Sequence, residues 1–303
     1  MPLFMGRTAL IFQNRFATSA LFRNFAPMKL IADSGSTKTD WALVDGKELV
    51  ETLHTQGINP IHQSENDVRT ILRNELMPQL AGREVQEIHF YGSGVRPTEE
   101  ALMQRLLQEA TGAQQVEAKS DLLGAARGLC NYSEGIVCIL GTGANSGYYD
   151  GKRIVMNTPP LGYILGDEGS GAVLGIRLLN GLYKGLLPHE LREEFESEYD
   201  LSLTEVINRV YRQPMPNRFL ASLSPFVHRH LHIPAISELV ISNFQDFIHR
   251  NIIPYEKPNI PLCAVGSIAF CYHEQLQKAA YREHLIFARV EKSPLQPLVY
   301  FHS

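Results

Sequence analysis

Two short segments rich in glycine, serine and threonine each follow an apolar run, and their residue types suit contact with phosphate. The first, DSGSTKTDW, occupies residues 33–41, and the second, GTGANSG, occupies residues 141–147. Turns without bulky side chains let backbone N–H groups approach an anion, and the hydroxyl groups of Ser36, Thr37, Thr39 and Thr142 add further donors. The sequence therefore predicts two phosphate-binding turns.

A carboxylate stands where the first apolar run ends. Asp33 follows Ala32 directly, and a carboxylate in this position suits Mg²⁺, which keeps much of its hydration shell and is held through water. Phosphate contacts beside a metal-binding carboxylate are typical of phosphoryl transfer, which depends on positioning and on neutralising charge. The P-loop pattern and the Gly-x-Gly-x-x-Gly dinucleotide pattern are absent, so these two classes of nucleotide-binding protein are excluded.

The elements that must position these turns occur twice. An apolar strand, a small-residue turn, a second strand, an Asp-Gly-Lys turn and a third strand follow one another in IADSGSTKTDWALVDGK and again in CILGTGANSGYYDGKRI. Strand and helix patterns alternate through residues 85–130, and most of residues 170–253 has the pattern of helices, including one at 217–227. We therefore expect an α/β fold with two duplicated domains, mixed sheets and flanking helices around a central cleft.

Composition narrows the class of protein. The chain has 303 residues, 44% of them hydrophobic, and a net charge of −4, so it can bury a core but lacks the basic surface that nucleic acids require. No run of about 18 apolar residues is present, which argues against a membrane partner. Because the four cysteines form no Cys-x-x-Cys pair, we expect reduced thiols in a cytoplasmic protein.

The first 27 residues differ from the rest of the chain. They contain three arginines, several aromatic residues and no acidic residue, which resembles the composition of a transit peptide. Met28, however, immediately precedes the first strand pattern. We therefore expect residues 1–27 to be a mis-assigned start or a disordered extension, with a targeting segment as the alternative.

Four segments, taken in order, resemble those of the N-acetylglucosamine kinase family, which shares its ATPase domain with BadF/BadG-type proteins. They are DSGSTKTDW, GTGANSG, PPLGYILGDEGSGAVLG and AVGSIAF, within residues 28–293. The family is similar in architecture to the actin, hexokinase and heat-shock ATPase superfamily. The resemblance implies two ribonuclease-H-like domains of the actin-like ATPase type. It also implies phosphorylation of an N-acetylated amino sugar, with ATP and Mg²⁺ as cofactors.

The resemblance also implies roles for individual residues. Asp121 would be the catalytic base, and Asp33 would hold the metal. The nucleotide would contact Gly35, Ser36, Thr37, Lys38, Gly141, Thr142, Gly143, Gly266 and Ser267. The sugar would contact Asn59, Asp121, Gly162, Asp167 and Glu168. By themselves, Asp121 could instead cap a helix, and Asp167 and Glu168 could be first-turn acids.

The implied domains are residues 28–132 and 133–287, and we expect residues 288–303 to pack back on the first domain. The final segment, KSPLQPLVYFHS, departs from the Gly-rich pattern that commonly follows Ser-Pro in the family, with Pro297 where flexibility or a continuing helix is expected. Two alternatives to a kinase stay open: an ATPase that drives conformational change in a partner, and a sugar-sensing regulator without turnover. The preferred sugar, the phosphorylated hydroxyl group and the formation of a homodimer stay undetermined.

Overall fold

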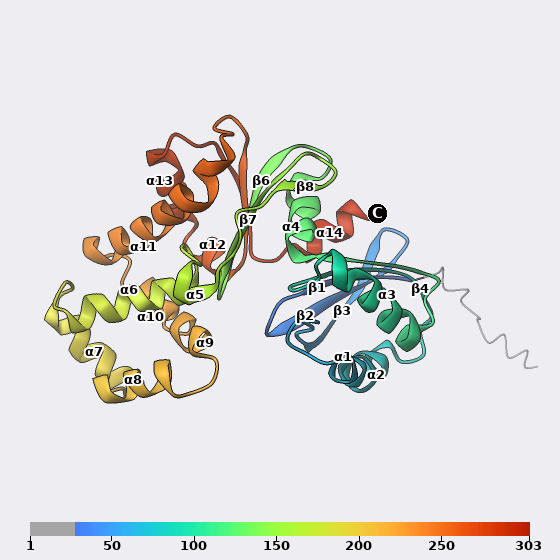
Figure 1. Ribbon diagram of the computed structural model, residues 1–303, viewed down its shortest axis with the longest axis horizontal. Helices are drawn as coiled ribbons and strands as arrows, with labels where there is room; N and C mark the ends of the chain where they lie inside the picture. The colour runs from blue at the N-terminus through green and yellow to red at the C-terminus, as the bar shows by residue number, and fades with distance from the viewer. Residues whose placement is uncertain (1–27) are drawn as a thin grey trace, which may run out of the picture.

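Two five-stranded mixed sheets organise the chain (Figure 1). The structure, a computed structural model, describes residues 28–303, so the expectation for residues 1–27 lies outside the described part. The first sheet contains β1 (Met28–Ser34), β2 (Lys38–Asp45), β3 (Glu48–Gln56), β4 (Val85–Gly92) and β5 (Gln115–Ser120). The second contains β6 (Gly135–Leu140), β7 (Ala144–Tyr149), β8 (Ile154–Met156), β9 (Leu262–Val265) and β10 (Phe287–Glu291).

The two sheets have the same topology. Their strand orders are β3-β2-β1-β4-β5 and β8-β7-β6-β9-β10. In each sheet the first three strands pair antiparallel, and the last two continue the sheet in parallel to the first. The predicted duplication of an α/β unit is therefore confirmed, as is the hairpin expected at Asp45-Gly46.

The helices of the first half are α1 (Glu65–Ile71), η1 (Leu72–Leu76), α2 (Met77–Leu80), α3 (Pro97–Thr111) and α4 (Asp121–Cys130). Those of the second half are α5 (Gly162–Leu165), α6 (Gly171–Tyr183), α7 (His189–Tyr199), α8 (Leu203–Tyr211), α9 (Pro216–Ala221), α10 (Ser224–Arg229), α11 (Pro234–Phe247), η2 (Ile248–Ile252), η3 (Ile253–Tyr255), α12 (Ser267–Cys271) and α13 (His273–Arg282). Helix α14 (Leu295–Phe301) ends the chain. None of the helices within residues 28–303 has the length and apolar character needed to span a membrane.

One expected helix is divided in the structure. Residues 217–227 were predicted to form a single helix, but they belong to α9 and α10, which are separated at Ser222 and Leu223. Pro225 lies in the first turn of α10. A proline there lacks an N–H donor and is tolerated at the start of a helix, whereas inside a continuous helix it would remove a hydrogen bond. The prediction of one helix is therefore wrong.

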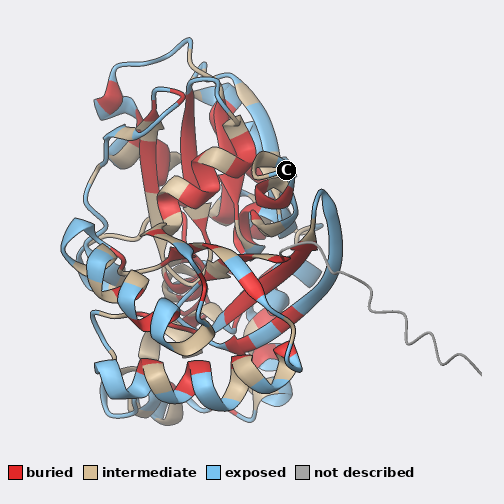
Figure 2. Ribbon diagram, turned by 90° about the vertical axis from the view of Figure 1, so that its right-hand side faces the viewer, coloured by how far each residue is buried: buried red, intermediate tan, exposed pale blue. Residues whose placement is uncertain are grey.

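Helices α4 and α14 each follow the last strand of one sheet and pack on the other sheet. Four apolar side chains of α4 form a buried cluster with β6, β7 and β9 of the second sheet: Leu122, Ala125, Ala126 and Leu129. Helix α14 places Leu298 and Val299 against β1 and β2 of the first sheet. This reciprocal exchange joins the two halves through apolar burial. Figure 2 shows that buried residues, in red, follow the strands and helices inside the molecule.

Pro297 packs against α4 without interrupting a helix. It lies in the first turn of α14, where backbone N–H groups have no partner within the helix. On the facing helix, a Cβ atom added to Gly128 would lie 3.2 Å from the Pro297 Cβ. The glycine thus permits close approach of the two helices at the proline.

A polar network holds the end of the chain on the first sheet. His302 Nε2 lies 2.9 Å from the Tyr91 hydroxyl, and the His302 ring stacks on His89 with centroids 3.7 Å apart. Arg127 of α4 donates to the same hydroxyl at 2.6 Å and to Glu117 at 2.8 Å. Burial lowers the pKa of His302 to about 3, and the positive charges of His89 and Arg127 act in the same direction. The folded protein therefore keeps His302 neutral.

Folding stability should consequently decrease on acidification through this histidine. Between 6.5, the ordinary pKa, and about 3, the unfolded chain binds a proton at His302 that the folded chain does not bind. Replacing His302 by Gln should reduce the loss of unfolding free energy between about pH 7 and about pH 5 by roughly 1 kcal/mol, after allowance for solvent screening. Chemical denaturation at the two pH values measures this difference.

His62→Gln, at an exposed histidine, is the matched control and should keep the pH dependence of the wild type. Parallel pH dependences of the wild type and His302→Gln would contradict a low pKa at His302.

Candidate functional site

The first small-residue turn leaves backbone donors open to solvent. The Gly35 N–H donates to the Lys38 carbonyl at 3.0 Å, which closes the turn. Within residues 28–303, the N–H groups of Ser36 and Thr37 have no hydrogen-bond acceptor, and both residues are exposed. Gly57 lies directly behind the turn, where a Cβ atom would come within 2.3 Å of the Gly35 carbonyl oxygen. This turn can therefore present two N–H groups to an anion.

The second turn has the same arrangement. The Gly141 N–H donates to the Gly143 carbonyl at 3.0 Å, and the N–H groups of Thr142 and Gly143 have no acceptor in the described part of the chain. The Gly171 N–H, in the first turn of α6, donates to the Gly141 carbonyl at 2.8 Å. The amino end of α6, which carries partial positive charge, thus adjoins the turn. Both turns are suited to phosphate.

Two acids lie at one edge of the first sheet. Asp33 is near the carboxyl end of β1, and Asp121 follows β5; because β1, β4 and β5 run parallel, these ends meet at the same edge. Burial, together with the negative charges of Asp121 and Asp40, raises the pKa of Asp33 to about 7. Burial also raises the pKa of Asp121 to about 6. Excess negative charge therefore gathers at this edge.

Asp121 does not cap α4. Ser120 is the N-cap residue, and its hydroxyl accepts from the Leu123 N–H at 3.3 Å. Asp121 is the first residue of the helix, and its carboxylate accepts from the Leu122 N–H at 2.8 Å. Because Ser120 satisfies the capping position, the capping alternative for Asp121 is wrong.

The surroundings of Asp33 are compatible with a hydrated metal ion. Its carboxylate accepts from the Ser293 hydroxyl at 3.3 Å, and Asp40 and Asp121 add negative charge. Within residues 28–303, no group of three or more His, Cys, Asp or Glu side chains is placed to hold a metal. Mg²⁺ is commonly bound by one or two carboxylates, with water and substrate phosphates completing its shell. The donors present therefore fit Mg²⁺ better than a metal that needs a protein cage.

Asn59 is tied to the end of β1. The preceding Ile58 N–H donates to the buried Ser34 hydroxyl at 3.0 Å. The Asn59 side-chain oxygen accepts from the Ile61 N–H at 3.0 Å, whereas its amide nitrogen has no hydrogen-bond acceptor in the described residues. A Cβ atom on Gly94 would lie 2.2 Å from that side-chain oxygen. The Asn59 amide group is therefore held in one orientation, and its nitrogen can donate to a ligand.

Asp167 belongs to the second turn. It has a left-handed backbone, with φ of 56°, and a Cβ atom on Gly143 would lie 3.0 Å from its carboxylate. Burial raises the pKa of Asp167, and the negative charge of Glu168 adds to this effect. The α6 helix has Ser170 as its N-cap and begins at Gly171, so both acids lie outside it. The expectation that they could be first-turn acids is wrong.

Glu168 faces a different set of groups. Its carboxylate lies 3.5 Å from Arg250 Nη1 and 3.5 Å from Asn251 Nδ2. In residues 28–303, no hydrogen bond or ion pair connects Asp167 or Glu168 with Asn59 or Asp121. The acids expected around the sugar thus form two groups, one on each half of the protein.

The remaining predicted site residues are two glycines and a serine. Gly266 has φ of 116°, and a Cβ atom there would lie 2.2 Å from the Leu140 carbonyl oxygen, next to the second turn. Ser267 is exposed at the start of α12, and Gly162 is exposed at the start of α5. Gly266 and Ser267 therefore adjoin the second turn, and the exposed Gly162 is connected to it through a backbone hydrogen bond to the Asp167 carboxylate.

One side chain connects the two halves at the first turn. Arg218 of α9 donates from Nη2 to the Ser36 carbonyl at 2.7 Å. The sequence reasoning missed Arg218 and Ser293, because neither lies in a small-residue segment or in an acidic motif. Ser34 lies within DSGSTKTDW but was given no role. Only the fold brings Arg218 to the first turn and Ser293 to Asp33.

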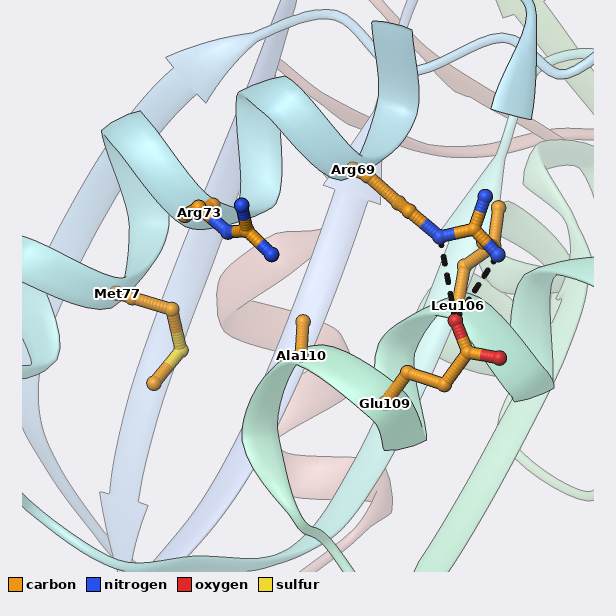
Figure 3. A pocket seen from close by; sticks show the side chains of 6 residues that line it. All are labelled: Arg69, Arg73, Met77, Leu106, Glu109 and Ala110. Atoms are coloured by element: carbon orange, nitrogen blue, oxygen red, sulfur yellow. Dashed lines mark hydrogen bonds and ion pairs between the residues drawn. The ribbon is translucent and has the colours of Figure 1, made fainter. Parts of the chain in front are cut away.

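A small, partly open pocket lies away from these residues (Figure 3). It has a volume of about 190 Å³ and is lined by Arg69, Arg73, Met77, Leu106, Glu109 and Ala110. Arg69 pairs with Glu109 at 3.0 Å across it. The pocket is formed between the helical segment 65–80 and α3 and contains none of the expected site residues. The candidate site is instead the set of groups along the facing edges of the two sheets.

No protein-family model matches the chain, and no curated protein does. Solved structures do. One from Porphyromonas gingivalis, described as a "Putative N-acetylglucosamine Kinase", is 45% identical, with 91% of this chain and 98% of that chain covered and a TM-score of 0.89. One with the same description from Chromobacterium violaceum is 17% identical, with 92% and 99% covered and a TM-score of 0.72.

A third structure extends the likeness in fold. A ROK family glucokinase from Streptomyces griseus, in complex with glucose and AMPPNP, is 15% identical, with 90% of this chain and 97% of that chain covered and a TM-score of 0.55. The expected two-domain fold of actin-like ATPases and sugar kinases is thus confirmed. Because the Porphyromonas relative shares 45% of its residues over nearly its whole length, the chain belongs to the N-acetylglucosamine kinase family.

Proposed function

We propose that this protein transfers the terminal phosphate of ATP to a hydroxyl group of an N-acetylated amino sugar, such as N-acetylglucosamine. The observation that carries the proposal is the pair of matching turns, each with two N–H groups that have no acceptor within residues 28–303. The description of the Porphyromonas relative supports the sugar, and the glucose and AMPPNP bound to the glucokinase support a sugar and ATP as the two substrates.

The turns would bind the phosphates. The N–H groups within Gly35–Lys38 and Gly141–Gly143 would contact the phosphates from the two halves. The Lys38 ammonium, which pairs with Asp40 at 2.6 Å, would add positive charge. Gly266, which has no side chain, and Ser267 would lie against adenosine. Such preorganised donors stabilise the charge of a phosphoryl group during transfer without reorganising.

Asp121 would act on the acceptor hydroxyl. A carboxylate can orient that hydroxyl and accept its proton late, when the new P–O bond makes it acidic. The hydrogen bonds to its carboxylate come from backbone N–H groups at the start of α4, and no side chain within residues 28–303 donates to it. Asn59, with its unused amide N–H, would hold the sugar from the same half. Gly162, Asp167 and Glu168 would contact it from the other half.

Asp33 would hold Mg²⁺ through water, and the ion would neutralise phosphate charge when bound. The Ser293 hydroxyl holds the Asp33 carboxylate in place. The negative charges of Asp40 and Asp121, which raise the pKa of Asp33, favour a cation beside it. Removing the divalent ion should therefore abolish phosphoryl transfer.

A coupled assay of ADP release with a panel of amino sugars tests the function. We expect ADP release only when ATP, a divalent ion and an N-acetylated amino sugar are all present, because a kinase that excludes water hydrolyses little ATP without acceptor. ADP release that is unaffected by any sugar would indicate a partner-driving ATPase. Sugar binding without any ADP release would indicate a sensor.

Asp121→Asn should separate catalysis from folding. The substitution removes the basic charge but keeps the size of the side chain, so kcat should fall by roughly 10²- to 10⁴-fold while the melting temperature and sugar affinity stay near those of the wild type. Ser120→Ala is the matched control: loss of the cap should cost about 1 kcal/mol of unfolding free energy and leave kcat nearly unchanged. Near wild-type turnover by folded Asp121→Asn would refute the catalytic assignment.

Asp33→Asn should weaken the binding of the divalent ion. With the carboxylate charge removed, kcat should fall by roughly 100-fold, and the Mg²⁺ concentration needed for half-maximal ADP release should rise. Sugar affinity should change little, because Asp33 is assigned to the metal. Asp45→Asn, at the end of β2 that is remote from the first turn, is the control. An unchanged Mg²⁺ titration in Asp33→Asn would remove Asp33 from the site.

A further inference from the structure

Arg218 reaches from one half of the protein to the first turn of the other. Its guanidinium donates from Nη2 to the Ser36 carbonyl at 2.7 Å. Ser36 also offers one of the unpaired N–H groups of that turn. Figure 1 shows α9, which carries Arg218, on the side of the second half that faces the first sheet. The guanidinium therefore lies against the first turn, at the edge of the proposed phosphate site.

The position of Arg218 is determined by the same elements that hold the second turn. Helix α9 packs tightly on α6, since a Cβ atom on Gly175 would lie 2.2 Å from the Leu220 carbonyl oxygen. A Cβ atom on Gly171, the first residue of α6, would lie 3.1 Å from the Ala221 Cβ. Gly171 in turn hydrogen-bonds to Gly141. Helix α9 is thus attached to the turn formed by Gly141–Gly143.

The charge of Arg218 is not neutralised by the protein. Within residues 28–303 it makes no ion pair, and its bond to Ser36 uses one of the five N–H donors of a guanidinium. Arg209 on the neighbouring helix α8 differs, because it pairs with Glu205 at 3.1 Å and lies over the Phe219 ring. A half-buried, unpaired guanidinium beside free backbone N–H groups is suited to an anion.

We infer that Arg218 binds the terminal phosphate of the nucleotide and so supplies, from the second half of the protein, a positive charge to the first phosphate-binding turn. The inference rests on the proposed function for the identity of the anion. A guanidinium can donate two parallel hydrogen bonds to a phosphate. The Ser36 carbonyl holds one N–H group, and the others remain available for phosphate oxygens. Because Arg218 and Ser36 lie on different halves, the phosphate would also connect them.

Nucleotide affinity without sugar tests the role of Arg218. Isothermal titration calorimetry with AMPPNP, ADP and AMP, each with Mg²⁺, compares the wild type with Arg218→Gln, Arg218→Lys and the control Arg209→Gln. Loss of a charge-assisted contact should weaken AMPPNP binding by about 10- to 100-fold in Arg218→Gln. AMP affinity and the melting temperature should not change. Arg218→Lys should recover part of the loss, and Arg209→Gln should bind all three nucleotides as the wild type does.

The outcomes distinguish this inference from the proposed function. Equal AMPPNP affinities of the wild type and Arg218→Gln, or an equal loss for AMP and AMPPNP, would overturn the role of Arg218 and leave the kinase proposal standing. A selective loss of AMPPNP binding in a protein that phosphorylates no amino sugar would support Arg218 and refute the substrate. A wild type that binds none of the three nucleotides would overturn both.

Discussion

The burial of α4 between the two sheets is the constraint on which the proposed site depends. Its apolar side chains pack on the second sheet, and on its other face a Cβ atom at Gly124 would lie 2.6 Å from the Tyr91 ring of β4. Arg127, in its last turn, is bound to Tyr91 and Glu117. A helix packed on both sides cannot rotate or slide without disrupting one core. The position of Asp121, at the first residue of this helix, is therefore fixed by both halves of the protein.

Charge is arranged in a complementary way along the facing edges. Asp33 and Asp121 are acids whose pKa values are raised by burial, so the folded protein bears a cost for keeping them ionised. The N–H groups of the two turns that are unpaired within residues 28–303, and the Arg218 guanidinium, favour negative charge instead. A magnesium-bound nucleotide brings both a cation and phosphate anions, so it would satisfy both sets of groups at once. The buried acids and unpaired donors, which are unfavourable in the free protein, are thus suited to binding a magnesium-bound nucleotide. Perturbed pKa values are typical of such functional sites.

Sequence patterns predicted the parts of this arrangement that depend on residues close together in the sequence. The alternating strands, the Asp45-Gly46 turn and the repeated small-residue turns follow from periodicity and turn chemistry. The break between α9 and α10 was missed because the apolar pattern continues across Pro225. The contact of Arg218 with Ser36 joins residues 182 positions apart, and it depends on how α9 packs on α6. No pattern within a single segment of the sequence predicts how two helices pack against each other.

For the candidate acids, too, the local sequence predicted some features, and tertiary packing determined the others. The motif around Asp121 placed it at the start of a helix, but only the structure assigned the cap to Ser120 and left the Asp121 carboxylate available. Asp167 and Glu168 are adjacent in sequence, yet one faces the second turn and the other faces Arg250 and Asn251. A left-handed residue at Asp167 produces this divergence, and the sequence carries no glycine there to indicate it.

The exchange of α4 and α14 between the sheets has a consequence for synthesis of the protein in the cell. Ile31, Ala42 and Val44 of the first sheet are covered by Leu298 and Val299, which the ribosome adds only after all strands of the second sheet. Domains commonly fold from the amino terminus as they emerge, but this part of the first sheet lacks the cover of α14 until the second sheet has been synthesised. The nascent chain must therefore carry these apolar side chains without α14 through the synthesis of the whole second sheet, and the first domain completes its packing only afterwards.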